Sequence, residues 1–287
     1  MARKVVIQKV DLDTALTAFI LGVSEEDDIT PVRDKASADD LLNPNVICIE
    51  CGGSGQVELS NFDHHDTDEE LPPACVQAYK LYGDDEHLNR LVEYVSTVDI
   101  RGPELVSRCS DSAKAFPTLS DLFSGMLLIT PDPKDQLLRG IEILRRVMRE
   151  EIDPFGVMPE DEEWGKYIEA KRRNKEEIKR ALDETLFFRT KGGLKAGFIK
   201  SNVIGVLGAL YRMGCKITIA YSPAFGDPPV PKYTIAGDGI RVDTLLKVLN
   251  EIDPGWGGPA HGTIIGSPRK GSKLSPQEVI DIVKRWL

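Results

Sequence analysis

The apolar positions in the first third of the chain fall in short runs that end on charged residues. Residues 5–7 form one such run, and Asp11 and Asp13 follow it before an apolar, helix-competent segment at residues 14–23. A second apolar run ends on Glu50 and leads into a glycine-rich turn. Short apolar runs bounded by turn residues are typical of buried strands. The pattern therefore predicts strands that deliver acidic residues to the points where they end.

The second half of the chain has longer elements. Residues 131–151 and 160–186 have helical patterns, and the charges of the longer segment favour a solvent-exposed linker helix. Shorter segments then alternate, with strands expected at 194–199, 216–221 and 232–236 and helices at 202–213 and 242–249. We therefore expect an N-terminal domain at residues 1–130, a helical linker at 131–188 and a smaller α/β domain at 189–287.

Two of the four histidines are adjacent, in the triplet Asp63-His64-His65. A neutral imidazole is a good ligand for a divalent metal ion, and carboxylates suit Mn or Mg. Adjacent side chains of an extended segment point in opposite directions, so the two imidazoles could serve a metal ion and a substrate oxygen. Taken alone, however, the triplet favours a polar turn with two solvated histidines.

The partners of this triplet change that interpretation. Four separate segments supply groups of the same kind: Asp11 and Asp13, Glu50, His64 and His65, and Asp99. We place the acids at strand ends, including Asp99 after residues 94–98, because ligands of open α/β sheets bind at the carboxyl ends of strands. Helix capping accounts for one such acid but is a poor explanation for four segments.

The type and order of these residues resemble the motifs of the DHH phosphoesterase superfamily. Its members include RecJ-type exonucleases, oligoribonuclease/pAp phosphatases, cyclic-dinucleotide phosphodiesterases, exopolyphosphatases and family II pyrophosphatases. The four motifs correspond here to Asp11 and Asp13, to Glu50, to Asp63-His64-His65 and to Asp99. The resemblance implies an α/β fold whose N-terminal domain has a mainly parallel sheet flanked by helices.

The resemblance also implies roles for these residues around two metal ions. One ion would be held by the first-motif histidine, Asp11 and the second-motif acid. The other would be held by Asp13, Glu50, His64 and Asp99. His65 would face the substrate phosphate, and Asp63 would orient a neighbouring imidazole, as carboxylates behind a metal ligand do.

Two positions depart from the family pattern. The first-motif histidine is replaced by Lys9, and Glu50 stands in place of an aspartate. A protonated lysine has no lone pair for a metal ion. We therefore hypothesise that the Lys9 ammonium replaces the first metal ion electrostatically, so that one bound ion is expected more than two. The alternatives are that Lys9 points into solvent and the function is lost, or that Gln8 completes the first site.

A second motif lies in the C-terminal domain. Gly257, Gly258 and His261 resemble the Gly-Gly-His motif of the DHHA1 domain, which binds the far end of the substrate in many DHH proteins, although two residues are inserted before this histidine. With Arg269 they are the candidate substrate-binding residues. A solvated glycine turn is the structural alternative. Trp256 is either a stacking platform for a base or a packing residue.

Composition narrows the classes of function. The net charge of −10 argues against broad binding to duplex DNA, which requires a basic surface. No apolar stretch approaches the length of a membrane span, and no signal peptide is apparent. Five cysteines, an odd number, favour reduced thiols and a cytoplasmic protein, with Cys48 as a buried strand residue.

The preferred function is a Mn- or Mg-dependent phosphohydrolase that acts on short oligonucleotides or small nucleotide phosphates through metal-activated water. The alternatives are an exopolyphosphatase or pyrophosphatase, and a nucleotide-binding pseudoenzyme with an impaired first metal site. The expected partner is a small phosphorylated substrate, such as a nucleotide or a short single strand. No membrane partner is expected, and a second copy of the chain is a candidate partner.

Overall fold

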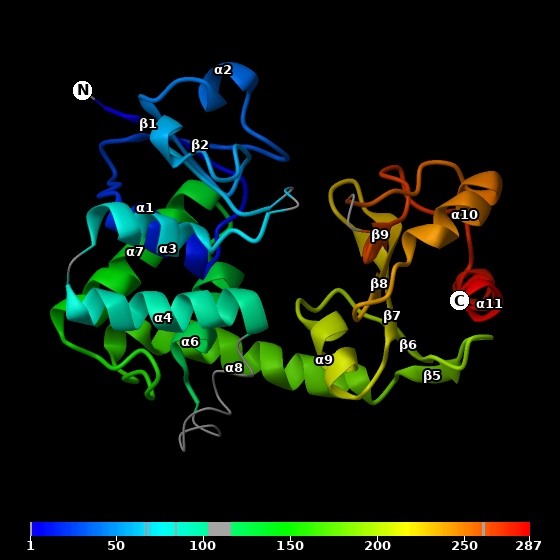
Figure 1. Ribbon diagram of the computed structural model, residues 1–287. Helices are drawn as coiled ribbons and strands as arrows, with labels where there is room; N and C mark the ends of the chain where they lie inside the picture. Colours follow the sequence, from blue (N-terminus) through cyan, green and yellow to red (C-terminus); the bar gives the residue numbers. More distant parts are fainter. Residues whose placement is uncertain (1, 66, 68, 84, 103–115, 260–261) are drawn as a thin grey trace. The chain divides into compact units, whose positions relative to one another are not determined.

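The computed structural model describes residues 2–65, 67, 69–83, 85–102, 116–259 and 262–287 (Figure 1). The chain divides into two compact units, Met1–Arg172 and Arg173–Leu287, here called unit 1 and unit 2. The boundary lies inside helix α8 (Glu162–Leu182). The predicted α/β fold class is confirmed, whereas the three functional parts with boundaries at 130 and 188 stay a prediction. Within the described ranges, no helix is long and apolar enough to cross a membrane.

Unit 1 is built on a four-stranded sheet in the order β2-β1-β3-β4, and all its pairings are parallel. The strands are β1 (Lys4–Ile7), β2 (Asp28–Pro31), β3 (Val46–Ile49) and β4 (Asn61–Phe62). Alternate side chains of β1 face opposite sides, as the pleat of a strand requires. Val5 and Ile7 join the main hydrophobic cluster, and Val6 packs with Cys48 in a smaller cluster on the other face.

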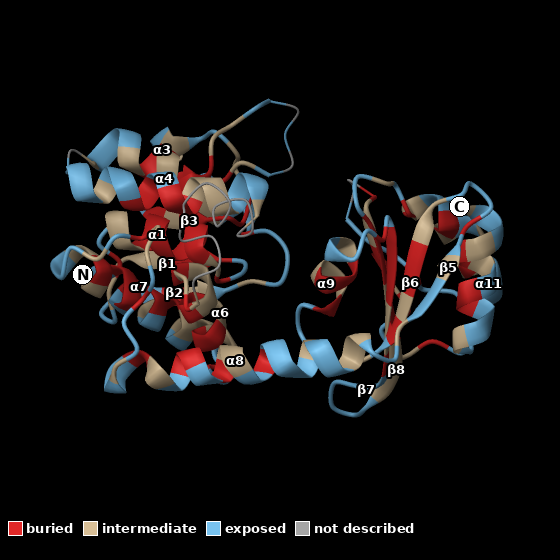
Figure 2. Ribbon diagram, turned by 90° about the horizontal axis from the view of Figure 1, so that it is seen from below, coloured by how far each residue is buried: buried red, intermediate tan, exposed pale blue. Residues whose placement is uncertain are grey.

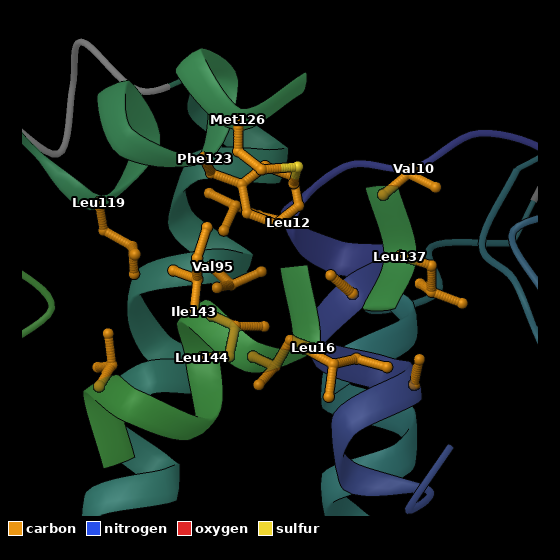
Figure 3. Packing of buried hydrophobic residues seen from close by; sticks show 14 of the residues in the cluster. Val10, Leu12, Leu16, Val95, Leu119, Phe123, Met126, Leu137, Ile143 and Leu144 are labelled. Atoms are coloured by element: carbon orange, nitrogen blue, oxygen red, sulfur yellow. The ribbon is translucent and has the colours of Figure 1, made fainter. Parts of the chain in front are cut away.

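Helices cover the face of the sheet that carries the main cluster. They are α1 (Leu12–Ile20), α3 (Ala74–Tyr82), α4 (Glu86–Arg101), α6 (Leu119–Ile129) and α7 (Pro133–Arg149). Figure 3 shows apolar side chains of α1, α4, α6 and α7 directed toward one another, and Leu16, Val95 and Leu144 belong to the same cluster. The short helices α2 (Ala38–Leu41) and η1 (Val57–Leu59) lie in the connections between strands.

Unit 2 contains a five-stranded sheet in the order β5-β6-β7-β8-β9. Its elements are β5 (Leu186–Arg189), β6 (Lys195–Lys200), α9 (Val206–Arg212), β7 (Ile217–Phe225), β8 (Val230–Gly237), η2 (Asp243–Leu245), α10 (Leu246–Ile252), β9 (Ile264–Gly266) and α11 (Pro276–Trp286). The β6–β7 pairing is parallel and the other three are antiparallel. Strands β6, β7 and β8 contain many of the buried residues of this unit (Figure 2). Ile199 packs with α9, whereas Phe198 packs with the cluster that includes α11, so both faces of the sheet are covered.

Two predicted elements differ from the structure for identifiable reasons. Residues 94–99 lie in helix α4 and not at a strand end, because Leu91, Val92 and Val95 are buried at helical spacing. The helix expected at 202–213 begins only at Val206, because Gly205 adopts φ +96° and so interrupts any right-handed helix before it.

Candidate metal centre

The first two acids lie at the junction of β1 and α1. Asp11 is the N-cap of α1, and its Oδ1 accepts a hydrogen bond from the backbone N–H of Thr14 at 3.0 Å. Asp13 is 2 % exposed, and its two carboxylate oxygens accept hydrogen bonds from Ala74 N at 2.9 Å and Cys75 N at 2.8 Å. These amides open helix α3, so two elements hold the Asp13 carboxylate in place.

Glu50 directly follows β3 and is buried. Its φ of +54° lies in the left-handed region, which is unusual for a residue with a side chain. Glu50 Oε2 lies 3.0 Å from Nδ1 of His65, and Oε1 lies 3.8 Å from Nε2 of His64. Glu50 thus contacts both adjacent histidines, one with each oxygen.

The triplet begins immediately after β4. The Asp63 carboxylate accepts hydrogen bonds from Gly52 N at 2.5 Å and from His65 N at 2.7 Å, and its Oδ1 lies 3.1 Å from His65 Nδ1. The rings of His64 and His65 have centroids 4.3 Å apart. The expectation that the two imidazoles point in opposite directions is therefore wrong, because the backbone here is not a regular strand and both rings turn toward Glu50.

Asp99 reaches the same place from the last turn of α4. Its Oδ2 lies 3.4 Å from His64 Nε2. Asp13, His64 and Asp99 each offer a ligand atom, and these atoms all lie within 4.8 Å of one another; Glu50, His64 and His65 form a second, overlapping set. The structure therefore brings together the four residues expected around one ion, and His64 belongs to both sets.

Two buried polar atoms of this cluster show whether its residues suit a metal ion. Glu50 Oε1 and His64 Nε2 are buried and have no hydrogen-bond partner among the described residues. Leaving buried polar atoms unpaired is costly, so such atoms call for a partner that the protein does not supply. A divalent ion bound by carboxylate oxygens and imidazole nitrogen satisfies both, and the donor set fits Mn or Mg.

The electrostatics of the cluster separate the roles of the two histidines. Burial lowers the pKa of His64, so its imidazole is neutral and can offer a lone pair to a metal ion. Hydrogen bonds to Asp63 and Glu50 raise the pKa of His65 to about 11, so His65 is a cation at neutral pH. The side chain of His65 is 59 % exposed, which leaves this cation accessible to an anionic ligand.

Burial acts on the acids in the opposite sense. It raises the pKa of Glu50 to about 8 and that of Asp13 to about 6, and it also raises the pKa of Asp99. Burial would raise the pKa of Asp63 as well, but hydrogen bonds from His65 and Gly52 outweigh it and leave this pKa lowered. Two buried acids, Asp13 and Glu50, and the more exposed Asp99 thus lie close together, and such a cluster favours a bound cation.

Lys9 lies near Asp11 and Asp13 in the sequence, and it is exposed to solvent. Its backbone oxygen accepts a hydrogen bond from Thr14 Oγ1 at 2.9 Å. No ion pair between Lys9 and Asp11 occurs among the described residues. The hypothesis that Lys9 stands in for a first metal ion stays a prediction, and the exposed position of Lys9 is what the solvent-directed alternative expects.

The candidate substrate-binding residues lie in unit 2. Gly257 pairs with Gly266 through two backbone hydrogen bonds, and a Cβ at Gly258 would lie 2.1 Å from the backbone oxygen of Ile264. Close backbone packing against β9 is therefore a sufficient reason for glycine at position 258. Arg269 is exposed, and His261 lies outside the described residues.

Trp256 is a packing residue and not a stacking platform for a base. It is buried, its ring lies 6.0 Å from that of Tyr233, and its Nε1 donates to Asp253 Oδ2 at 3.2 Å. The indole is thus part of the core of unit 2, where it cannot offer a free face to a base.

The sequence did not point to Gln77 or to the start of α3 as parts of the site. Gln77 Nε2 donates to the backbone oxygens of Asp63 at 3.0 Å and Pro72 at 2.8 Å, and so fixes the chain that carries the two histidines. Pro72 and Pro73 before an apolar segment were the available signal, because proline is favoured just before or at the first residues of a helix.

No family model matches the sequence, and no curated protein matches it. Among solved structures, the chain is similar to PggH, a pGpG-specific phosphodiesterase from Vibrio cholerae, with a TM-score of 0.60 and 13% identity over 98% of this chain and 96% of that chain. A DHH domain from a member of the s1p family of ribosomal proteins matches at a TM-score of 0.45 and 14% identity, over 98% of this chain and 85% of that one. The chain therefore shares its fold with this phosphodiesterase.

Proposed function

We propose that the protein is a metal-dependent phosphohydrolase that acts on small nucleotide phosphates or short oligonucleotides. The observation that carries this proposal is the convergence of Asp13, His64 and Asp99 on one point, next to the unpartnered oxygen of Glu50. A buried carboxylate oxygen and a neutral imidazole nitrogen that lack hydrogen-bond partners are better explained by a metal site than by stability. The shared fold supports the class of reaction.

The side chains divide the work between ion and substrate. Asp13, Glu50, His64 and Asp99 would hold a divalent ion. His65 belongs to the overlapping set with Glu50 and His64, and Asp11 is close enough for its charge to act on Asp13. The chemistry that such an ion supplies is activation of water near neutral pH and polarisation of a phosphoryl oxygen. Asp63 keeps His65 protonated and fixed in orientation, so that its exposed ring can donate a hydrogen bond to a phosphate oxygen.

A linear dinucleotide is the first substrate to test, because the structural neighbour with the shared fold is a pGpG-specific phosphodiesterase. The chain carries a net charge of −10, so a phosphate must be attracted by local cations. In unit 1, His65 is such a cation and Lys9 is a further candidate. In unit 2, Arg269 is a separate candidate for contact with a phosphate.

The test is a phosphate- and nucleotide-release screen with Mn or Mg over pGpG, pAp, cyclic dinucleotides and short polyphosphate. We expect turnover of a nucleotide substrate that is lost in His64→Ala. His87→Ala is the matched control, because His87 is exposed in the first turn of α4 and belongs to neither ligand set. Turnover by His64→Ala equal to that of the wild type would contradict the proposed site.

A nucleotide-binding pseudoenzyme is the second candidate, and the specific observation in its favour is Lys9 in place of the expected histidine ligand. In that case the same screen would give saturable nucleotide binding in the presence of metal but no release of product. Release from polyphosphate alone would favour the exopolyphosphatase or pyrophosphatase alternative.

A further inference from the structure

Strand β5 is the outermost strand of the unit 2 sheet, and within the described part of the chain no strand pairs with its outer edge. The strand is short and apolar, with the sequence Leu-Phe-Phe-Arg. Leu186 is 48 % exposed and Phe187 is 39 % exposed. Exposed apolar edge strands present unpaired backbone groups to other chains, and native proteins normally protect them.

The hydrogen-bond pattern shows which backbone groups of β5 face outward. Thr190 N donates to Leu194 O at 3.0 Å, which extends the antiparallel register that pairs Phe188 with Ala196. Hydrogen-bonded pairs alternate along an antiparallel ladder. The peptide groups of Leu186, Phe188 and Thr190 therefore face β6, and those of Phe187 and Arg189 face the open edge.

The charges that flank β5 have opposite signs at its two ends. Asp183 and Glu184 precede the strand, and Arg189 and Lys191 end and follow it. A second copy of the same strand, run antiparallel, would place its acidic end beside the basic end of the first. A parallel neighbour would instead place like charges side by side, which is destabilising.

We propose that β5 pairs with β5 of a second copy of this chain across a twofold axis at Phe187. Opposite residues of an antiparallel pair have their side chains on the same face of the sheet. A twofold axis perpendicular to the sheet must therefore place one residue directly opposite its own copy. At Phe187 the outward N–H and C=O groups of both copies meet as a hydrogen-bonded pair. Arg189 N–H then meets the carbonyl oxygen of the partner's Thr185, and the two sheets join into one.

Apolar surface beside the strand adds to this interface. The end of α11 lies against the turn that follows β5, because Lys191 N donates to Lys284 O at 2.7 Å and Gly192 N donates to Leu287 O at 3.0 Å. Trp286, in the last turn of this helix, is 56 % exposed. An exposed indole close to an open apolar edge is typical of the centre of protein–protein interfaces.

The first experiment measures the mass of the full chain in solution by light scattering after gel filtration. We expect the wild type to have the mass of two chains and Phe187→Lys to have the mass of one. The matched control is Phe225→Lys, because Phe225 is also an exposed phenylalanine of the same sheet, 58 % exposed and far from the β5 edge in strand order. Far-UV circular dichroism checks that each variant is folded.

The second experiment reverses the charges at one end of the strand. Asp183→Lys with Glu184→Lys makes both ends basic, and Arg189→Glu with Lys191→Glu makes both ends acidic. At low salt each variant alone is expected to be monomeric, and an equimolar mixture is expected to form a dimer with one copy of each. A monomeric wild type, or a dimer that survives Phe187→Lys and both charge reversals, would overturn the proposal.

Discussion

Glu50 gives the two adjacent histidines different chemistry. Its Oε2 contacts His65, which is held as a cation together with Asp63, whereas its Oε1 faces the neutral His64 and has no protein partner. One residue therefore links the group that would hold metal to the group that would meet substrate. Replacement of Glu50 would disturb both, so its effect on turnover would mix the two, and a measurement of metal binding alone is needed to separate them.

Metal affinity is predicted to rise with pH. Burial raises the pKa of Glu50 to about 8, so this ligand holds a proton below that pH in the metal-free protein. A metal ion must displace the proton, and affinity should therefore increase by about tenfold for each pH unit between about pH 6 and pH 8. Calorimetric titration with Mn in buffers of different ionisation enthalpy measures both the affinity and the proton released. Glu50→Gln should remove most of this slope, and an equal slope in that variant would refute the assignment.

Lys9→His is predicted to restore a second metal ion. The wild type should bind one Mn ion tightly per chain, because Lys9 supplies no lone pair beside Asp11. Elemental analysis after removal of weakly bound metal should give about two ions per chain for Lys9→His and about one for Lys9→Ala. Two tightly bound ions in the wild type would instead show that another side chain, such as Gln8, completes the first site.

The sequence predicted which residues gather at the site better than it predicted how. The resemblance of these acids and histidines to the DHH motifs implied that Asp13, Glu50, His64 and Asp99 meet. Their local geometry depends on contacts across the fold, such as the amides of α3 that hold Asp13 and the left-handed backbone of Glu50. Such contacts leave no periodic signal in the sequence.

At the scale of elements, the helices of unit 1 pack closely enough to exclude side chains at some positions. Gly125 of α6 faces α8 so closely that a Cβ there would lie 2.0 Å from the backbone oxygen of Tyr167. A Cβ added at Gly165 of α8 would have no other atom within 4 Å. The two glycines thus differ in packing although both lie in helices.

Gly125→Ala is predicted to destabilise the protein by about 2 kcal/mol or more, because the clash is with backbone and one helix must move. Gly165→Ala is predicted to stabilise it by about 0.5 kcal/mol, because alanine is the better helix former and meets no obstacle. Urea denaturation monitored by circular dichroism measures both changes. Equal changes in the free energy of unfolding for the two substitutions would show that α6 and α8 do not approach each other closely at Gly125.

Whether a segment forms a helix or a strand was harder to predict than which residues meet at the site. The sequence led us to expect Asp99 at a strand end after residues 94–98, because ligands of open α/β sheets bind at the carboxyl ends of strands. The structure places them in α4, where Leu91, Val92 and Val95 pack against the core and Asp99 is left in the last turn. Asp99 reaches His64 from a helix, so its role did not require the strand end on which the expectation rested.

At the scale of the whole molecule, the two units have separate cores. The main cluster of unit 1 draws on residues from Val5 to Ile168, and the largest cluster of unit 2 on residues from Ala196 to Val283. All four predicted ligands of the metal centre belong to unit 1. Metal binding should therefore stabilise the two units unequally.

Mn is predicted to protect the backbone of unit 1 from hydrogen exchange and to leave unit 2 unchanged. A ligand that binds only the folded state adds about 2.7 kcal/mol of stability when its concentration is 100 times Kd. Exchange followed by mass spectrometry should show slower exchange in α1, α3 and α4, and no change in β7 and β8. His64→Ala should abolish the protection, and equal protection of both units would contradict a centre confined to unit 1.

The double attachment of Asp13 has a practical consequence for capturing a substrate complex. A structural study of that kind needs a variant that is inert but otherwise undisturbed, and acidic metal ligands are the usual choice. Asp13 is unsuitable, since its carboxylate also anchors the first two amides of α3, and an asparagine there would meet those donors with an NH₂ group. Asp99, on the last turn of α4 with a side chain 23 % exposed, offers the cleaner substitution, and Asp99→Asn is the form to crystallise with pGpG.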